Sequence, residues 1–290
     1  MKWISLLILI SIKLNAFSQL VHSSDYLVNS SIRINCQKII TKDGRTDTLD
    51  ISGTGFYFYY STPKGYFPVI VSNKHLINGM NKQILQFKHA DSIGNPLVGL
   101  SENVILQNPE TKWMLHPDSD VDLAILPIGG LLNNFKSKNI SIYFKGFDET
   151  LIPNDSTKKS LMAIEEVLMI GYPFGLRDDI NDLPVVRRGL TATPFDKDFN
   201  GKKIFLCDIP VYPGSSGSPV LIYNPTSFSA KDGNMYLKSR IILLGINFAT
   251  YTRDFTAKIL PTSTIATAIP YNIGIIIKSE RLLDFKKFIN

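Results

Sequence analysis

Short apolar or alternating segments follow one another along most of this chain, and this recurrence constrains the fold more than any other feature. Gly, Pro, Asn or Asp separates most of them, and they comprise Ser31–Ile40, Gly55–Tyr60, Phe67–Ser72, Ile84–Lys88, Val121–Pro127, Val167–Gly171, Lys203–Ile209, Ser218–Tyr223 and Ile241–Phe248. Strand-length segments bounded by turn formers are typical of all-β barrels and sandwiches, not of alternating strands and helices. We therefore expect an all-β protein.

The polar stretch Gly129–Ser160 divides the chain into two halves, each of a size suited to one small β-barrel. We expect an N-terminal barrel at 19–135, a linker at 136–160, and a C-terminal barrel at 161–290 that ends in a helix capped by Ser279. Two barrels joined in this way leave a cleft between them, where functional sites are commonly assembled.

The first residues have the pattern of an export leader. A basic residue precedes the apolar run Trp3–Ile12, and the small residues Ala16 and Ser18 follow at the positions that a signal peptidase reads. The run is too short to cross a bilayer, which disfavours a membrane anchor. We expect residues 1–18 to be removed, leaving a secreted or periplasmic protein with no membrane association.

Charge and cysteine content bound the partners of the chain. The formal net charge of +6 is spread without a dense Lys/Arg block, so we expect no nucleic-acid partner. Cys36 and Cys207 lack the spacing of a zinc site, and both a disulfide and two free buried thiols remain open. We expect a monomer that uses no metal and no cofactor.

The segment Pro213–Val220, with the sequence PGSSGSPV, has the composition of a nucleophile turn. Gly214 permits a tight turn that exposes the Ser216 hydroxyl, and the amides of Gly214 and Ser216 are the expected donors to an oxyanion. An ordinary Gly/Ser turn is the alternative. A nucleophile elbow of the α/β-hydrolase type is excluded, because Ser218 occupies its last Gly position and Pro219 prevents the following helix.

A histidine and an aspartate stand at the ends of apolar segments. His75 follows one such segment directly, a rigid position suited to a general base. Asp122 lies near the start of another, where a carboxylate is costly unless a group such as a His N–H pairs with it. Asp118 and Asp120 alternate with Asp122, but the central Gly and distal Glu of a calcium loop are missing. We interpret His116 as loop structure.

Four motifs together resemble a known family. They are Gly53–Phe56, Ser72–His75, Asp122–Ile125 and Gly214–Pro219, and their order is that of the landmarks of chymotrypsin-fold, trypsin-like serine proteases. The resemblance covers about residues 30 to 280 and includes features of the bacterial branch, such as the glutamyl endopeptidases and heat-shock proteases, here without a PDZ-like region. It implies two six-stranded antiparallel β-barrels.

The resemblance also implies an activity. His75, Asp122 and Ser216 would form the catalytic triad of a serine endopeptidase that cleaves a protein or peptide through an acyl-enzyme. Two alternatives stay open. One is a protease fold that serves as a binding module without turnover, and the other is an esterase or amidase that uses the same triad.

The same resemblance locates the primary specificity pocket. Its expected substrate-binding residues are Pro210, Ser215, Asn247, Phe248, Ala249 and Thr250. Asn247 replaces the His with which glutamyl endopeptidases bind an acidic side chain, and Pro210 replaces the Asp of trypsin-like specificity. An uncharged residue at the cleavage point is therefore expected. Ser215 replaces the Asp that captures a freed N-terminus in animal enzymes, so no activating cleavage is expected.

Overall fold

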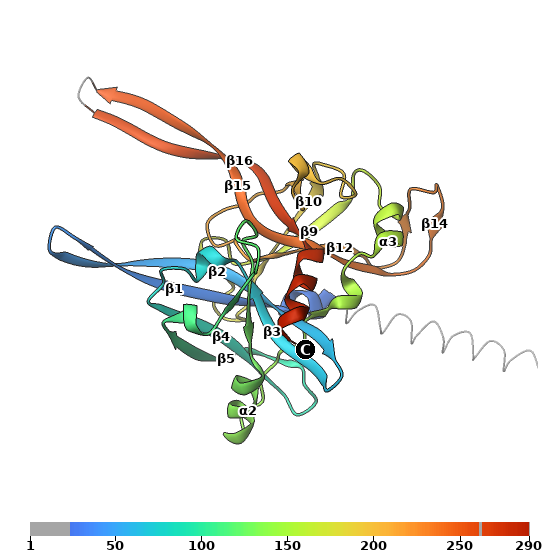
Figure 1. Ribbon diagram of the computed structural model, residues 1–290, viewed down its shortest axis with the longest axis horizontal. Coiled ribbons are helices and arrows are strands. Elements are labelled where there is room, and N and C mark those ends of the chain that lie inside the picture. The colour runs from blue at the N-terminus through green and yellow to red at the C-terminus, as the bar shows by residue number, and fades with distance from the viewer. Residues whose placement is uncertain (1–23, 261–262, 290) are drawn as a thin grey trace, which may run out of the picture.

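The computed structural model describes residues 24–260 and 263–289, with the backbone alone over 253–270. Two β-rich halves lie side by side, an N-terminal sheet and a C-terminal barrel (Figure 1). The expected all-β architecture is confirmed. The expected leader, 1–18, lies outside the described residues. No helix among the described residues is both long and apolar enough to cross a membrane.

The first half is a sheet of eight strands in the order β5-β4-β1-β2-β3-β7-β6, with β8 paired in parallel to β2. The strands are β1 (Ser31–Lys42), β2 (Arg45–Thr62), β3 (Gly65–Ser72), β4 (Lys82–Ala90), β5 (Pro96–Gln107), β6 (Met114–Leu115), β7 (Ala124–Pro127) and β8 (Phe147–Asp148). The sheet has eight strands rather than six because β6 and β8, of two residues each, join it.

The second half closes into a six-stranded antiparallel barrel in the order β10-β11-β16-β15-β12-β9, as expected. Its strands are β9 (Glu166–Gly171), β10 (Val185–Thr191), β11 (Ile204–Asp208), β12 (Pro219–Asn224), β15 (Arg240–Leu260) and β16 (Ser263–Lys278), and a small hairpin pairs β13 (Phe228–Ser229) with β14 (Met235–Tyr236). Inward side chains such as Phe205, Val220 and Leu244 are fully buried and fill the barrel.

Two long hairpins project from the molecule (Figure 1). The β1–β2 hairpin turns at Asp43 and Gly44, whose φ angles of 52° and 75° match the two-residue turns that follow the twist of an antiparallel pair. The β15–β16 hairpin extends beyond the barrel on the same side of the view. Its base, where β15 leaves the barrel, carries the Asn247–Thr250 segment.

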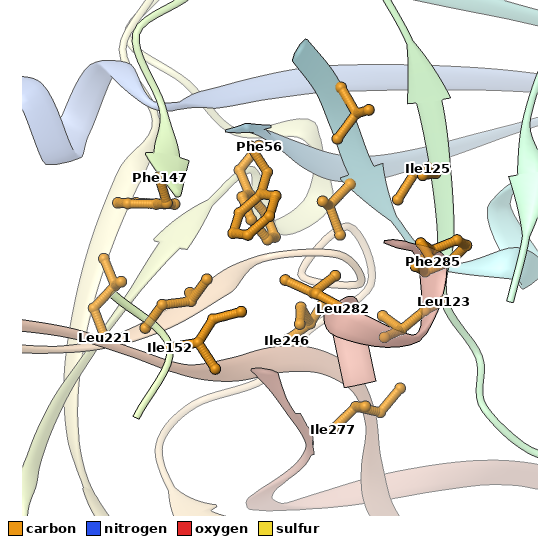
Figure 2. Packing of buried hydrophobic residues seen from close by; sticks show 14 of the residues in the cluster. Phe56, Leu123, Ile125, Phe147, Ile152, Leu221, Ile246, Ile277, Leu282 and Phe285 are labelled. Atoms are coloured by element: carbon orange, nitrogen blue, oxygen red, sulfur yellow. The ribbon is translucent and has the colours of Figure 1, made fainter. Parts of the chain in front are cut away.

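A shared core joins the two halves (Figure 2). Phe56 and Ile125 of the first sheet pack in one cluster with Leu221 and Ile246 of the barrel, and Phe285 of the C-terminal helix completes it. All five side chains are buried. The side chains at the interface between the halves are therefore as buried as those inside either half, and their packing fixes the position of one half against the other.

The helical segments depart from the sequence-based expectation. The polar stretch contains two short helices that were not expected, α2 (Gly129–Ser137) and α3 (Asp155–Ser160). The expected C-terminal helix is a 3₁₀ helix, Ser279–Phe288, and the prediction that Ser279 caps it is wrong. Lys278 precedes the helix instead, because the pairing of its amide with the Lys203 carbonyl carries β16 up to that residue.

Candidate active site

The β3–β7 pairing brings a histidine and an aspartate together. Ser72 pairs with Ala124, so the residues that follow β3 and precede β7 meet at one edge of the sheet. His75 lies in a 3₁₀ turn, Lys74–Leu76, directly after β3. Its Nδ1 is 2.6 Å from Oδ2 of Asp122, and its backbone N–H donates to Oδ1 at 3.0 Å. Oδ2 thus orients the imidazole, the backbone bond to Oδ1 fixes the carboxylate, and Nε2 is directed away from Asp122.

Neighbouring side chains hold this pair in place. Nδ2 of Asn73, which is fully buried, donates to the carbonyl of Asp122 at 2.6 Å. Nζ of Lys74 donates to the carbonyl of Asp118 at 2.7 Å. The loop that presents the carboxylate is therefore tied to the two residues that directly precede His75.

The turn that carries Ser216 connects β11 to β12, and its carbonyls are anchored away from the site. Four consecutive carbonyls each accept a hydrogen bond: Pro213 O from Phe174 N at 2.5 Å, Gly214 O from Thr54 Oγ1 at 2.9 Å, Ser215 O from Asn247 Nδ2 at 3.1 Å, and Ser216 O from Thr54 N at 2.8 Å. The backbone of this turn is thus fixed peptide by peptide.

The amides of the same turn divide into two kinds. Ser215 N donates to Tyr212 O at 2.9 Å, and Gly217 N donates to Asn247 O at 2.8 Å. The amides of Gly214 and Ser216 donate to no other described residue. Since the N–H and C=O of a peptide point in opposite directions, the anchored carbonyls turn these two amides toward the opposite side. They are the two amides expected to bind an oxyanion.

Two glycines of the turn have a conformational requirement. Gly214 has φ of 91°, and a Cβ there would lie 2.3 Å from the carbonyl oxygen of Tyr172. Gly217 has φ of 84°, and a Cβ there would lie 1.9 Å from the carbonyl oxygen of Thr54. Any other residue is excluded at both positions by backbone strain and by collision with backbone atoms.

A cavity of about 460 Å³ joins the two halves of the site. Its lining residues are Asp50, Ile51, Ser52, His75, Leu76, Phe174, Pro213, Gly214 and Ser216. The side chain of His75 is 45% exposed and Ser216 is half-buried, so a molecule in this cavity reaches both. The fold thus brings His75, Asp122, Gly214 and Ser216 to one place.

The residues expected to line the specificity pocket lie at the nucleophile turn and at the base of the β15–β16 hairpin. Asn247 and Ser215 are fully buried, and their side chains bond within the turn. Phe248 packs against the core shared by the halves. Ala249 pairs with Ile275 of β16, Oγ1 of Thr250 donates to the carbonyl of Ile273 at 2.9 Å, and the carbonyl of Pro210 accepts from Arg187.

Two side chains at the turn were not singled out from the sequence. Thr54 lies within the Gly53–Phe56 motif, but nothing in that motif indicates that its hydroxyl reaches the nucleophile turn. Nη1 of Arg187, on β10, donates at 2.8 Å to the carbonyl of Pro210 and at 2.8 Å to Oγ of Ser215. Arg187 is one of the half-buried residues of a strand that alternates exposed and half-buried positions, and no local pattern marks it as a contact of the turn.

The two cysteines are free and buried, so the disulfide alternative is wrong. Cys36 belongs to the core of the first sheet and Cys207 to the core of the barrel. Burial raises the pKa of the Cys36 thiol to about 12 and raises that of Cys207 further. Both are protonated at neutral pH and neither is a nucleophile. Within the described ranges, no three His, Cys, Asp or Glu residues gather as metal ligands.

Comparison with known proteins gives one family and a set of distant structures. The sequence model of the trypsin-like peptidase domain matches residues 53–224, more than half of the chain. The HtrA-type protease AlgW with a decapeptide is 14% identical, with a TM-score of 0.49 over 90% of this chain and 63% of its own. The active form of the Rv3671c protease of M. tuberculosis is 13% identical, with a TM-score of 0.42 over 89% of this chain and 79% of its own. None of the curated proteins matches this chain.

Proposed function

This chain belongs to the family of trypsin-like peptidase domains and has the chymotrypsin fold of a serine protease, and from that premise we propose that it is a secreted serine endopeptidase with His75, Asp122 and Ser216 as its catalytic triad. The observation that carries the proposal is the pair of unbonded amides, Gly214 and Ser216, beside a cavity that His75 and Ser216 line together.

The proposed mechanism follows from the positions of these groups. His75 Nε2 takes the proton of Ser216 Oγ as that oxygen attacks the peptide carbonyl, and Asp122 stabilises the imidazolium that forms. The amides of Gly214 and Ser216 donate to the oxyanion of the tetrahedral intermediate. His75 then protonates the leaving amine, and water, activated by His75, hydrolyses the acyl-enzyme. Neither a metal nor a cofactor takes part in any step.

The substrate is proposed to be a protein or peptide with an uncharged residue at the cleavage point. The guanidinium of Arg187 bonds to the carbonyl of Pro210, in the segment expected to form one wall of the specificity pocket. This positive charge adds to the argument against cleavage after Lys or Arg, because like charges repel at short range. The leader pattern at residues 1–18 supports action outside the cytoplasm, and we propose that the protein acts as a monomer.

The test is labelling of the purified protein, residues 19–290, with a fluorophosphonate probe, together with cleavage of casein. Wild type should label and cleave, and Ser216→Ala and His75→Ala should do neither at a measurable rate. Asp122→Asn should lower kcat by roughly 10³- to 10⁴-fold, because the carboxylate no longer fixes the imidazole tautomer. His89→Ala is the control, since His89 lies on β4, away from the cavity, and faces Glu102.

The alternatives give different results. Folded wild type that neither labels nor cleaves casein would be a binding module with a protease fold. Wild type that labels and hydrolyses a small ester but leaves casein intact would be an esterase or amidase. Labelling that survives Ser216→Ala would remove Ser216 from the role of nucleophile.

A further inference from the structure

Arg187 enters the interior of the barrel behind the nucleophile turn. On β10 it pairs with Met169 of β9, which is fully buried. Nη1 donates to the carbonyl of Pro210 and to Oγ of Ser215, both at 2.8 Å. These two acceptors lie at the ends of the segment Pro210–Ser215, which contains Gly214 and directly precedes Ser216. One side chain thus spans the turn from inside.

Ser215 is the point on which the inner bonds of the turn converge. Its Oγ accepts from Arg187 and also from the amide of Tyr212 at 3.2 Å, while its own amide donates to the carbonyl of Tyr212. Its carbonyl, which accepts from Asn247, belongs to the same peptide as the unbonded amide of Ser216. A shift of Ser215 therefore rotates the peptide on which the oxyanion site depends.

The charge of Arg187 is isolated. Among the described residues, no carboxylate forms an ion pair with it, and its buried Nε and Nη2 have no hydrogen-bond partner. Burial lowers the pKa of the guanidinium to about 10, so it is charged at neutral pH. An unpaired cation that is partly buried destabilises a fold, whereas a charged donor makes stronger hydrogen bonds than a neutral one. We therefore attribute the compensating stabilisation to the two hydrogen bonds that Arg187 donates to Pro210 O and Ser215 Oγ.

We propose that Arg187 is a positioning residue that holds the Pro210–Ser216 turn in its oxyanion-binding shape from within the barrel. The proposal rests on the proposed peptidase function. Arg187 acts through Ser215 and Pro210 and not by touching substrate, because its two unpaired nitrogens are buried. Among the described residues, the anchors of the turn, Arg187 included, come from strands and loops of the two halves.

The test compares Arg187→Met with wild type in the full secreted chain. The first readout is the second-order rate constant of fluorophosphonate labelling, which is independent of the residue at the cleavage point. The second is kcat and KM for a peptide series with Ala, Gln, Glu or Phe at that point. Arg188→Met is the matched control, because Arg188 is the next residue of β10, is exposed, and pairs with Glu166.

The expected result is a loss confined to the chemical step. Arg187→Met should lower labelling and kcat by roughly 10- to 100-fold, somewhat less than the loss of one oxyanion donor, and equally for all four peptides. KM should stay within about threefold, since ground-state binding does not use the oxyanion site. Arg187→Lys should fall between wild type and Arg187→Met, because an ammonium keeps the charge but cannot match the guanidinium geometry. Arg188→Met should behave as wild type.

Two results would overturn the positioning role. One is a folded Arg187→Met, judged by circular dichroism and Tm, that labels at the wild-type rate. The other is a loss limited to the Glu peptide, which would mean that Arg187 reads the substrate directly. If Arg187→Met does not fold, Arg187→Lys carries the same comparison. Inactive wild type would instead contradict the proposed function.

Discussion

Thr54 connects the histidine side of the site to the serine side. Its amide donates to Ser216 O at 2.8 Å, and its hydroxyl donates to Gly214 O at 2.9 Å while accepting from Tyr172 N at 3.0 Å. Its carbonyl accepts from Oγ of Ser72, three residues before His75, at 2.8 Å. Thr54 is fully buried, so all four groups bond within the protein. One residue of the first sheet thus links the strand that precedes His75 to the turn that carries Ser216.

Thr54→Val should keep the volume of the side chain and lose both hydroxyl bonds. Two buried backbone groups, Tyr172 N and Gly214 O, would be left without partners, and each such loss destabilises a fold by about 1–3 kcal/mol. We expect a lower free energy of unfolding in urea and a fall in fluorophosphonate labelling of roughly tenfold, less than the loss of a whole oxyanion donor.

The control is Thr62→Val on the same strand, where the hydroxyl bonds to Gly65 O at 2.7 Å in an exposed hairpin. This variant should change neither measurement. A Thr54→Val protein that is less stable but labels at the wild-type rate would show that Thr54 joins the halves without shaping the turn.

At the residue scale, the sequence was sufficient to predict the candidate site residues that lie at the ends of strands. His75 and Asp122 each border an apolar segment, and the structure places them within hydrogen-bonding distance because those segments pair as β3 and β7. The residues that anchor the turn carrying Ser216 could not be predicted in this way. The roles of Thr54 and Arg187 depend on contacts between residues more than 20 positions apart, which no local spacing encodes.

At the scale of elements, the C-terminal 3₁₀ helix is fastened to the loop that presents Asp122. Nε2 of His116 lies 3.0 Å from Oδ2 of Asp284, and Nδ1 of the same ring accepts from the amide of Asp118 at 3.1 Å. Arg281 of the helix donates to Oδ2 of Asp118 at 2.7 Å. His116, interpreted from the sequence as loop structure, is therefore a buried residue whose hydrogen bonds connect this loop to the helix.

The free energy of unfolding should fall in mild acid because of His116. Burial, followed by the charge of Arg281, lowers the pKa of His116 below its ordinary 6.5, although Asp284 opposes the shift. Between the lowered value and 6.5 the unfolded chain binds a proton that the folded chain does not. The free energy of unfolding therefore decreases as the pH falls through this window, and His116 has no effect above it.

Urea unfolding across pH 5 to 7.5 measures this dependence. His116→Gln, which keeps a donor toward Asp284 but does not titrate, should flatten the profile. Carboxylates such as Asp118 and Glu280, whose pKa values are lowered in the folded chain, change charge mainly below this range. An equally steep profile in His116→Gln would assign the acid sensitivity to another group.

Long strands with alternating apolar residues could be predicted from the sequence, whereas the shortest strands and helices could not. The alternation of apolar residues identified the long strands, because strand faces alternate with a period of two. The strands β6 and β8 have two residues each and are defined only by their partners. The helices α2 and α3 lie in a polar stretch, and together they bury a single residue, Phe135, so they carry little amphipathic signal.

At the scale of the whole molecule, each half has its own core, and a third core joins them. Cys36 and Cys207 lie in the two separate cores, so no disulfide stabilises the assembly. We expect no reaction of the native protein with a thiol reagent, two reactive thiols in guanidinium, and a Tm that is unchanged by dithiothreitol. Fewer than two thiols in guanidinium would contradict this assignment.

The core shared by the two halves (Figure 2) also has a consequence for activity. In the proposed function the base, His75, comes from one half and the nucleophile, Ser216, from the other, and the shared core and the Thr54 contacts join the two halves. In the terms of a protein engineer, this is a two-input gate, in which neither fragment gives an output alone. Activity therefore reports assembly, and a chain divided between its halves would serve as a sensor for whatever brings the pieces together.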